Sequence, residues 1–144
     1  MAATLRIARP EDAAAVLRLV TVSHDETGQP ADPATREIAI DAILSGDVPG
    51  ALYLIGPPSS PVGYLSISFG HSLATGTTAR LEEIFLRAPV RGRGMGTEAV
   101  QALSKMLEQN GIAQLSATVP ETDSGFFQRL RFQPSGGTDM VRAL

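Results

Sequence analysis

The sequence predicts a layered α/β fold built around a mixed sheet. Strand-like runs alternate along the chain with runs of helical period. A glycine-rich segment, residues 91–96, joins a strand-like run to a helix-like run. The length of 144 residues suits one domain spanning residues 1–144.

The first predicted elements are a strand and a helix. Thr4 to Arg9 alternates apolar and polar residues, which indicates a half-buried strand. Pro10 and the two carboxylates that follow it favour the start of a helix. Its apolar positions recur at helical spacing: Ala13, Val16, Leu17 and Val20. Turn-forming residues predict a loop from Thr21 to Pro33.

A second helix and two paired strands are expected next. The helix should run from about Ala34 to Leu44. The strands should cover Ala51 to Ile55 and Val62 to Phe69. Their link, residues 56–61, contains prolines that cannot continue a strand ladder, so the pair reads as a hairpin.

The following strand carries two adjacent glutamates. Gly70 to Thr78 is turn-like, and Ala79 to Leu86 is the expected strand. Side chains alternate between the faces of a strand, so Glu82 and Glu83 are expected on opposite faces.

The C-terminal third continues the alternation. A helix is expected from Thr97 to Asn110, stopped by a left-handed Asn-Gly pair. A strand should cover Ile112 to Val119, and a short capped helix should end near Arg131. A final strand is expected from Thr138 to Leu144.

Composition excludes several functional classes. The chain has no cysteine, which rules out disulfides, thiolate metal ligands and a cysteine nucleophile. Its two histidines, His24 and His71, lack metal-ligand spacing, so no metal is expected. The net charge of −3 argues against nucleic-acid binding. The sequence shows no bilayer-spanning run and no signal peptide, so we expect a cytoplasmic protein that does not engage membranes.

The segment from Arg91 to Gly96 has the chemistry of an anion site. Glycines let a ligand approach the main chain, and the first N-H groups of the next helix lack intrahelical partners. The helix dipole and the two arginines favour phosphate or diphosphate. A plain tight turn and an RNA-binding segment are the alternatives.

The pattern Arg91-x-x-Gly94-x-Gly96 resembles the acyl-CoA-binding motif of the GNAT (GCN5-related N-acetyltransferase) superfamily. The stretches LRIARPEDAAAVLRLV, ARLEEIFLRAPVRGRGMGTEAVQAL and SGFFQRLRF are similar to its first strand and helix, its core and its penultimate helix. The resemblance implies helices on both faces of the sheet, with the fourth and fifth strands splayed apart. It also implies acetyl transfer from acetyl-CoA to a primary amine by direct attack in a ternary complex. The alternative is a CoA-binding module with weak or lost activity.

The resemblance also implies roles for particular residues. Glu82 and Glu83 are both candidates for the general base that deprotonates the amine. The main-chain N-H of Ile84 is the expected oxyanion donor. The expected cofactor-binding residues are Ile84, Phe85, Leu86, Arg91, Gly92, Arg93, Gly94, Met95, Gly96, Thr97 and Phe127.

The chain departs from the family pattern near its end. Phe127 stands where a tyrosine is often the acid for the departing thiolate, and Arg131 replaces a glycine. Water, Ser124, Tyr64 or His71 are the alternative proton donors.

The acceptor is expected to be a small-molecule or peptide amine, and the sequence leaves its identity open. It also leaves the oligomeric state open, with a homodimer the common case in such folds.

Overall fold

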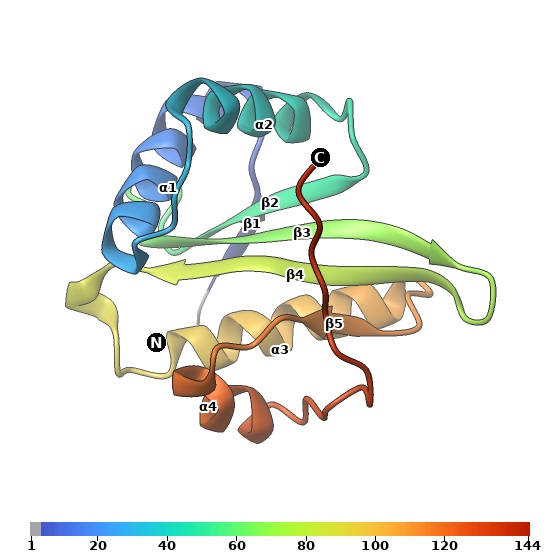
Figure 1. The fold of residues 1–144 in the computed structure, drawn as a ribbon. Helices are drawn as coiled ribbons and strands as arrows, with labels where there is room; N and C mark the ends of the chain where they lie inside the picture. The colour runs from blue at the N-terminus through green and yellow to red at the C-terminus, as the bar shows by residue number, and fades with distance from the viewer. Residues whose placement is uncertain (1–3) are drawn as a thin grey trace.

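The computed structural model describes residues 4–144 and has the expected layered α/β architecture (Figure 1). Five strands form one sheet in the order β1-β2-β3-β4-β5. They are β1 (Leu5–Ile7), β2 (Gly50–Ile55), β3 (Gly63–Ser72), β4 (Gly76–Leu86) and β5 (Leu115–Ala117). Neighbours are antiparallel from β1 to β4, whereas β4 and β5 are parallel. The sheet is therefore mixed, and the β2–β3 hairpin is confirmed.

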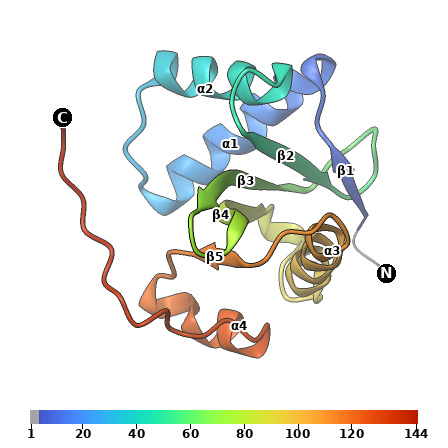
Figure 2. The ribbon, with the colours of Figure 1, turned by 90° about the vertical axis from the view of Figure 1, so that its right-hand side faces the viewer.

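Helices cover both faces of this sheet, as expected (Figures 1 and 2). They are α1 (Ala13–Thr27), α2 (Pro33–Ser45), α3 (Met95–Gln109) and α4 (Ser124–Arg129). One core cluster joins α1 and α2 to β2, Tyr64 and Phe85. The other joins α3 and Phe127 to β3 and β4. Parallel strands need a crossover, and α3 supplies it between β4 and β5.

The first helix is longer than the sequence predicts. It continues through Thr27, so the expected loop from Thr21 is wrong. Ser23 and His24 are buried and extend the inward face of Val16 and Val20. Gly28 then ends the helix at φ +69°, with its N-H bonded to the carbonyl of His24. Packing on the sheet outweighs the turn-forming residues of this segment.

The β3–β4 hairpin is also longer than expected. Pairing continues to Ser72 and Gly76, which confines the turn to residues 73–75 instead of Gly70 to Thr78. Gly76 has φ +84°, a conformation that favours glycine. The antiparallel ladder satisfies main-chain groups that a loop would leave to water.

A β-bulge in β4 changes which face its glutamates occupy. Ser66 pairs with Glu83 and Ile67 pairs with Leu81, so Glu82 is the extra residue. The expected alternation is therefore wrong. Glu83 contacts His24 of α1, and Glu82 contacts Ser68, which shares the face of β3 with Tyr64. Both carboxylates lie on the sheet face that α1 and α2 cover.

The C-terminal region departs most from expectation. β5 is shorter than predicted, and residues 138–144 form no strand. Asp139 accepts hydrogen bonds from Thr118 and Arg80, so the segment is held by side chains as it passes the sheet (Figure 2). Gly136, two residues before the expected strand, has φ +89°. Within residues 4–144, no helix is long and apolar enough to cross a membrane.

Candidate functional site

The pairing of β4 with β5 stops before the end of β4. The last paired residues are Leu81 and Ala117, so the strands separate where the glutamates begin, as expected. The N-H of Arg87 donates to the carbonyl of Val62, the residue before β3, at 2.8 Å. Hydrogen bonds alternate along an antiparallel ladder, so the main-chain groups of Ile84 and Leu86 face away from β3. They therefore line the gap that β5 leaves.

Arg91 connects this open edge to α1. Its Nε donates to the main-chain oxygen of Leu86 at 2.7 Å, and its Nη2 forms an ion pair with Glu26. Its guanidinium also lies 5.4 Å from the ring centroid of Phe85, a cation–π distance. The Arg91 side chain therefore bonds both the sheet and the end of α1.

The glycine turn that follows has an open main chain. Gly92 and Gly94 have φ +79° and +80°, and a Cβ at either would meet no atom within 4 Å. Gly94 is the N-cap of α3, and no side chain caps this helix. The first intrahelical bond runs from the N-H of Glu98 to the carbonyl of Gly94 at 3.0 Å. Three N-H groups therefore precede it without helical partners, those of Met95, Gly96 and Thr97.

Arg93 provides a cation beside this turn. It is exposed, and its side chain makes no ion pair with any residue from 4 to 144. The helix dipole places partial positive charge at the same end of α3. A free guanidinium, open N-H groups and left-handed glycines together suit a phosphate or diphosphate.

Three predicted cofactor residues are part of the core instead of the open surface. Phe85 is buried in the cluster that α1 and α2 form with the sheet. Met95 is buried in the cluster that joins α3 to the sheet. Phe127 is 6% exposed and packs edge-on against Phe126 and Phe132, each at 5.2 Å between ring centroids. Phe127 also lies in the α3 cluster, on the sheet face opposite the glutamates.

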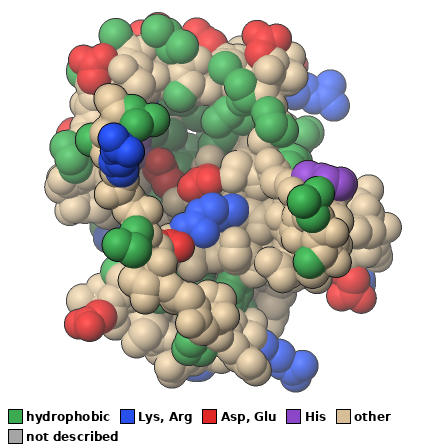
Figure 3. Space-filling model, turned by 45° about the vertical axis from the view of Figure 1, so that its right-hand side comes forward, with side chains coloured by type: hydrophobic (Ala, Val, Ile, Leu, Met, Phe, Trp, Pro, Cys, Tyr) green, Lys and Arg blue, Asp and Glu red, His purple; other side chains and the backbone are tan. Residues whose placement is uncertain are grey.

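The two glutamates have different partners on their shared face. Oε1 of Glu83 accepts a 2.7 Å hydrogen bond from the Tyr64 hydroxyl and lies 2.9 Å from Nε2 of His24. Glu82 accepts a 2.6 Å bond from the Ser68 hydroxyl, and its other oxygen is 3.8 Å from Nε of Arg80. Both side chains stay about two-fifths exposed, at 40% and 44%. Figure 3 shows acidic and basic side chains gathered beside a hollow in the molecular surface.

Sequence reasoning missed His24 and Tyr64 as partners of Glu83. It placed His24 in a loop and considered Tyr64 as a core aromatic or a proton donor. The available signal was the helical spacing from Val16 through Val20 to His24, followed by Gly28 as a helix stop.

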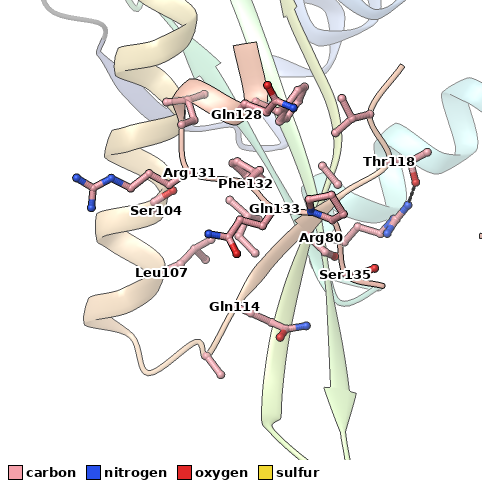
Figure 4. A pocket seen from close by; sticks show the side chains of 18 of the residues that line it. Arg80, Ser104, Leu107, Gln114, Thr118, Gln128, Arg131, Phe132, Gln133 and Ser135 are labelled. Carbon is pink, nitrogen blue, oxygen red and sulfur yellow. Dashed lines mark hydrogen bonds between the residues drawn. The ribbon is translucent and has the colours of Figure 1, made fainter. Parts of the chain in front are cut away.

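A cavity of about 860 Å³ lies beside β5, between α3 and the segment after α4 (Figure 4). Phe127 and Phe132 are part of its apolar lining, and Arg80 and Thr118 lie at its polar side. Neither glutamate and no residue of the glycine turn lines it. Among residues 4–144, no group of three acidic or histidine side chains is placed to hold a metal ion.

Comparisons with known proteins agree with this geometry. A model of the acetyltransferase (GNAT) family matches residues 14–132. An integron cassette protein from the mobile metagenome of Cole Harbour Salt Marsh superposes with a TM-score of 0.85 at 26% identity, covering 97% of this chain and 90% of that one. No curated protein matches the chain.

Two solved structures with lower identity share the fold. A possible acetyltransferase from Clostridium difficile 630 has a TM-score of 0.86 at 11% identity, covering 100% of this chain and 99% of that one. A predicted acetyltransferase with acetyl-CoA from Clostridium acetobutylicum has a TM-score of 0.80 at 11% identity, with coverage of 97% and 96%.

Proposed function

Since the chain belongs to the acetyltransferase (GNAT) family, we propose that it transfers an acetyl group from acetyl-CoA to a primary amine. The acceptor is a small molecule or a peptide. The observation that supports this most directly is the position of Glu83. Its carboxylate lies on β4 just past the last β4–β5 pair and on the strand that leads to the glycine turn.

The acyl donor would be held by residues of the described chain. Its diphosphate suits the open N-H groups at the start of α3 and the free guanidinium of Arg93. Its pantetheine arm suits the main-chain groups of Ile84 and the N-H of Leu86, which would bond it as a missing strand would. The carbonyl of Leu86 is already bonded to Arg91. Acetyl-CoA supplies the thioester that is cleaved.

Glu83 is the preferred general base of the two glutamates. A lysine-like amine is mostly protonated at neutral pH, because its ordinary pKa is near 10.4. A carboxylate close to the thioester can accept that proton directly or through water. Glu83 is oriented by Tyr64 and His24, whereas Glu82 bonds Ser68 and faces Arg80. The main-chain N-H of Ile84 is the proposed oxyanion donor.

A CoA-binding module with weak or lost activity is the second candidate. It is favoured by Phe127, which has no hydroxyl and is buried among aromatic rings. A Tyr-dependent protonation of the thiolate is therefore excluded at this position, and water is the proposed proton source.

Calorimetry and a thiol assay test both candidates. Titration with CoA and acetyl-CoA should produce binding heat, and Arg93→Ala should weaken it. Acetyl-CoA with a library of amines should then release free thiol. Binding without thiol release from any amine would favour the module. The absence of heat with either form of the coenzyme would overturn both.

A further inference from the structure

A buried polar cluster connects α1 and α2 to the carboxylate of Glu83. His24 is 8% exposed and Tyr64 is fully buried, and both contact the same oxygen, Oε1. Arg36 of α2 completes the cluster, with its Nε donating to Nδ1 of His24 at 3.2 Å. Its Nη1 also donates to the Thr21 hydroxyl at 3.3 Å, which holds the guanidinium in place. The cluster thus forms a continuous series of hydrogen bonds from α2 through α1 to β4.

The direction of each hydrogen bond follows from the chemistry of Arg36. A guanidinium carries only donors, so Nδ1 of His24 must present its lone pair to it. A neutral imidazole then carries its single hydrogen on Nε2. That hydrogen faces Oε1 of Glu83 at 2.9 Å. A second hydrogen on Nδ1 would face the N-H of Arg36, so the arrangement selects the neutral Nε2-H form.

Tyr64 is the second fixed donor to this oxygen. Burial raises its pKa well above the ordinary value, and the hydrogen bond to Glu83 and the charge of Glu83 raise it further. The hydroxyl therefore stays protonated and donates. Oε1 has two donors, whereas Oε2 accepts no hydrogen bond from any residue between 4 and 144. Since the Glu83 side chain is 40% exposed, Oε2 is open to a ligand.

We propose that His24 and Tyr64 are positioning residues that hold Oε1 of Glu83, so that Oε2 alone receives the proton of the acceptor amine. Arg36 acts one step further away by selecting the histidine tautomer. In the reaction, an ammonium N-H bond breaks and its proton moves to Oε2. The freed amine lone pair then forms the C-N bond, and the carbonyl π electrons move to oxygen to give an oxyanion. The C=O bond re-forms as the C-S bond breaks, and the nitrogen loses its second proton to water, which protonates the departing thiolate. This inference rests on the proposed function.

The first test reads the hydrogen-bond chain without any activity assay. The chain has two histidines, so the His71→Gln variant leaves His24 as its only imidazole. Long-range ¹H–¹⁵N correlation on this variant near pH 8 should show the Nε2-H tautomer of His24. Adding Arg36→Met should weaken that preference without abolishing it, because Oε1 of Glu83 still accepts a hydrogen from Nε2. An Nδ1-H tautomer, or an even mixture with Arg36 present, would overturn the assignment.

The second test separates positioning from structural support. His24→Leu removes the donor at similar volume, and His24→Gln keeps a side-chain N-H. We expect His24→Leu to lower kcat about 10- to 100-fold with little change in the KM for acetyl-CoA, since misplaced groups cost rates of this order. His24→Gln should recover part of the loss, and Tyr64→Phe should resemble His24→Leu. Gln109→Leu, an exposed change at the end of α3, is the control and should leave kcat unchanged.

The possible outcomes are distinguishable. A folded His24→Leu variant with wild-type kcat would overturn the inference and leave the proposed function standing. If His24→Leu fails to fold, then Tyr64→Phe, His24→Gln and the tautomer measurement decide. A wild-type chain that acetylates no amine would overturn the proposed function and, with it, proton transfer to Oε2. The tautomer measurement would still test the hydrogen bonds from Arg36 to Glu83, because it needs no activity.

Discussion

Glu82 and Glu83 both lie opposite Ser66 of β3, because the bulge in β4 places two residues against one. The bulge turns both carboxylates to the face covered by α1 and α2. Their surroundings nevertheless differ, since Glu83 contacts buried donors and Glu82 contacts the hydroxyl of Ser68. This difference makes the two glutamates a matched pair for mutagenesis.

Glu83→Gln should lower kcat/KM by about 10²- to 10⁴-fold, the usual range for loss of a general base. Glu82→Gln removes the same charge one residue away and should leave kcat/KM near the wild-type value. Thiol release with saturating acetyl-CoA measures both. Equal losses, or a larger loss in Glu82→Gln, would assign the base differently.

Gly94→Ala should weaken acetyl-CoA binding by an amount that the loss of protein stability does not explain. A side chain in the left-handed region costs about 1–2 kcal/mol, and the new Cβ would project into the open space beside the turn. Gly111→Ala is the control, because Gly111 has φ +78° and equally open surroundings at the other end of α3. Both variants should lose similar stability in urea, but only Gly94→Ala should raise the KM for acetyl-CoA. A matching KM increase in Gly111→Ala would argue against a ligand at the turn.

Arg93→Ala should raise the Kd for CoA roughly 10- to 100-fold, since a hydrogen bond to a charged group contributes about 1.5–3 kcal/mol. Added salt should reduce the difference between wild type and variant. Arg142→Ala removes the same charge from the C-terminal segment and should leave Kd unchanged. Isothermal titration of the three proteins at two salt concentrations provides the measurement. An unchanged Kd in Arg93→Ala would place the diphosphate elsewhere.

Arg131→Gly should stabilise the fold by about 1 kcal/mol. Arg131 has φ +69°, the one positive φ outside glycine among the described residues. It follows α4 in a left-handed stop, where Phe132 N-H bonds the carbonyl of Phe127 and Arg131 N-H bonds that of Gln128. Glycine removes the Cβ strain at this position. Thermal unfolding should show a higher Tm for Arg131→Gly and none of this gain for Arg131→Ala.

Asp12→Asn should destabilise the protein at neutral pH more than in acid. A hydrogen bond from Arg6 at 2.9 Å, then one from the N-H of Arg9, holds the pKa of Asp12 below its ordinary value. A lowered pKa in the folded state contributes stability above the unfolded pKa of about 3.9, and that stability is lost as pH falls through the folded pKa. Urea unfolding should show that the difference in the free energy of unfolding between wild type and Asp12→Asn is smaller at about pH 3 than at about pH 7. Asp41→Asn, an exposed change on α2, should show no such gap.

Local sequence patterns were sufficient to predict the order of the elements from β1 to α4 and the position of the glycine turn. Alternating apolar residues located β1 to β4, and helical spacing located α2 and α3 to within a few residues. These features depend on side-chain periodicity and on the freedom of glycine, which operate over a few neighbouring residues. The helix after the turn starts at Met95, two residues before the expected Thr97.

The arrangement around Glu83 depended on contacts between distant segments. The bulge at Glu82 is a property of register with β3, so no pattern within β4 alone reveals it. The extra turns of α1 form because Ser23 and His24 are buried against the sheet, and only those turns bring His24 to a residue 59 positions away. Residues 138–144 have a strand-like composition but no ladder partner, because a strand needs a neighbouring edge as well as a suitable sequence.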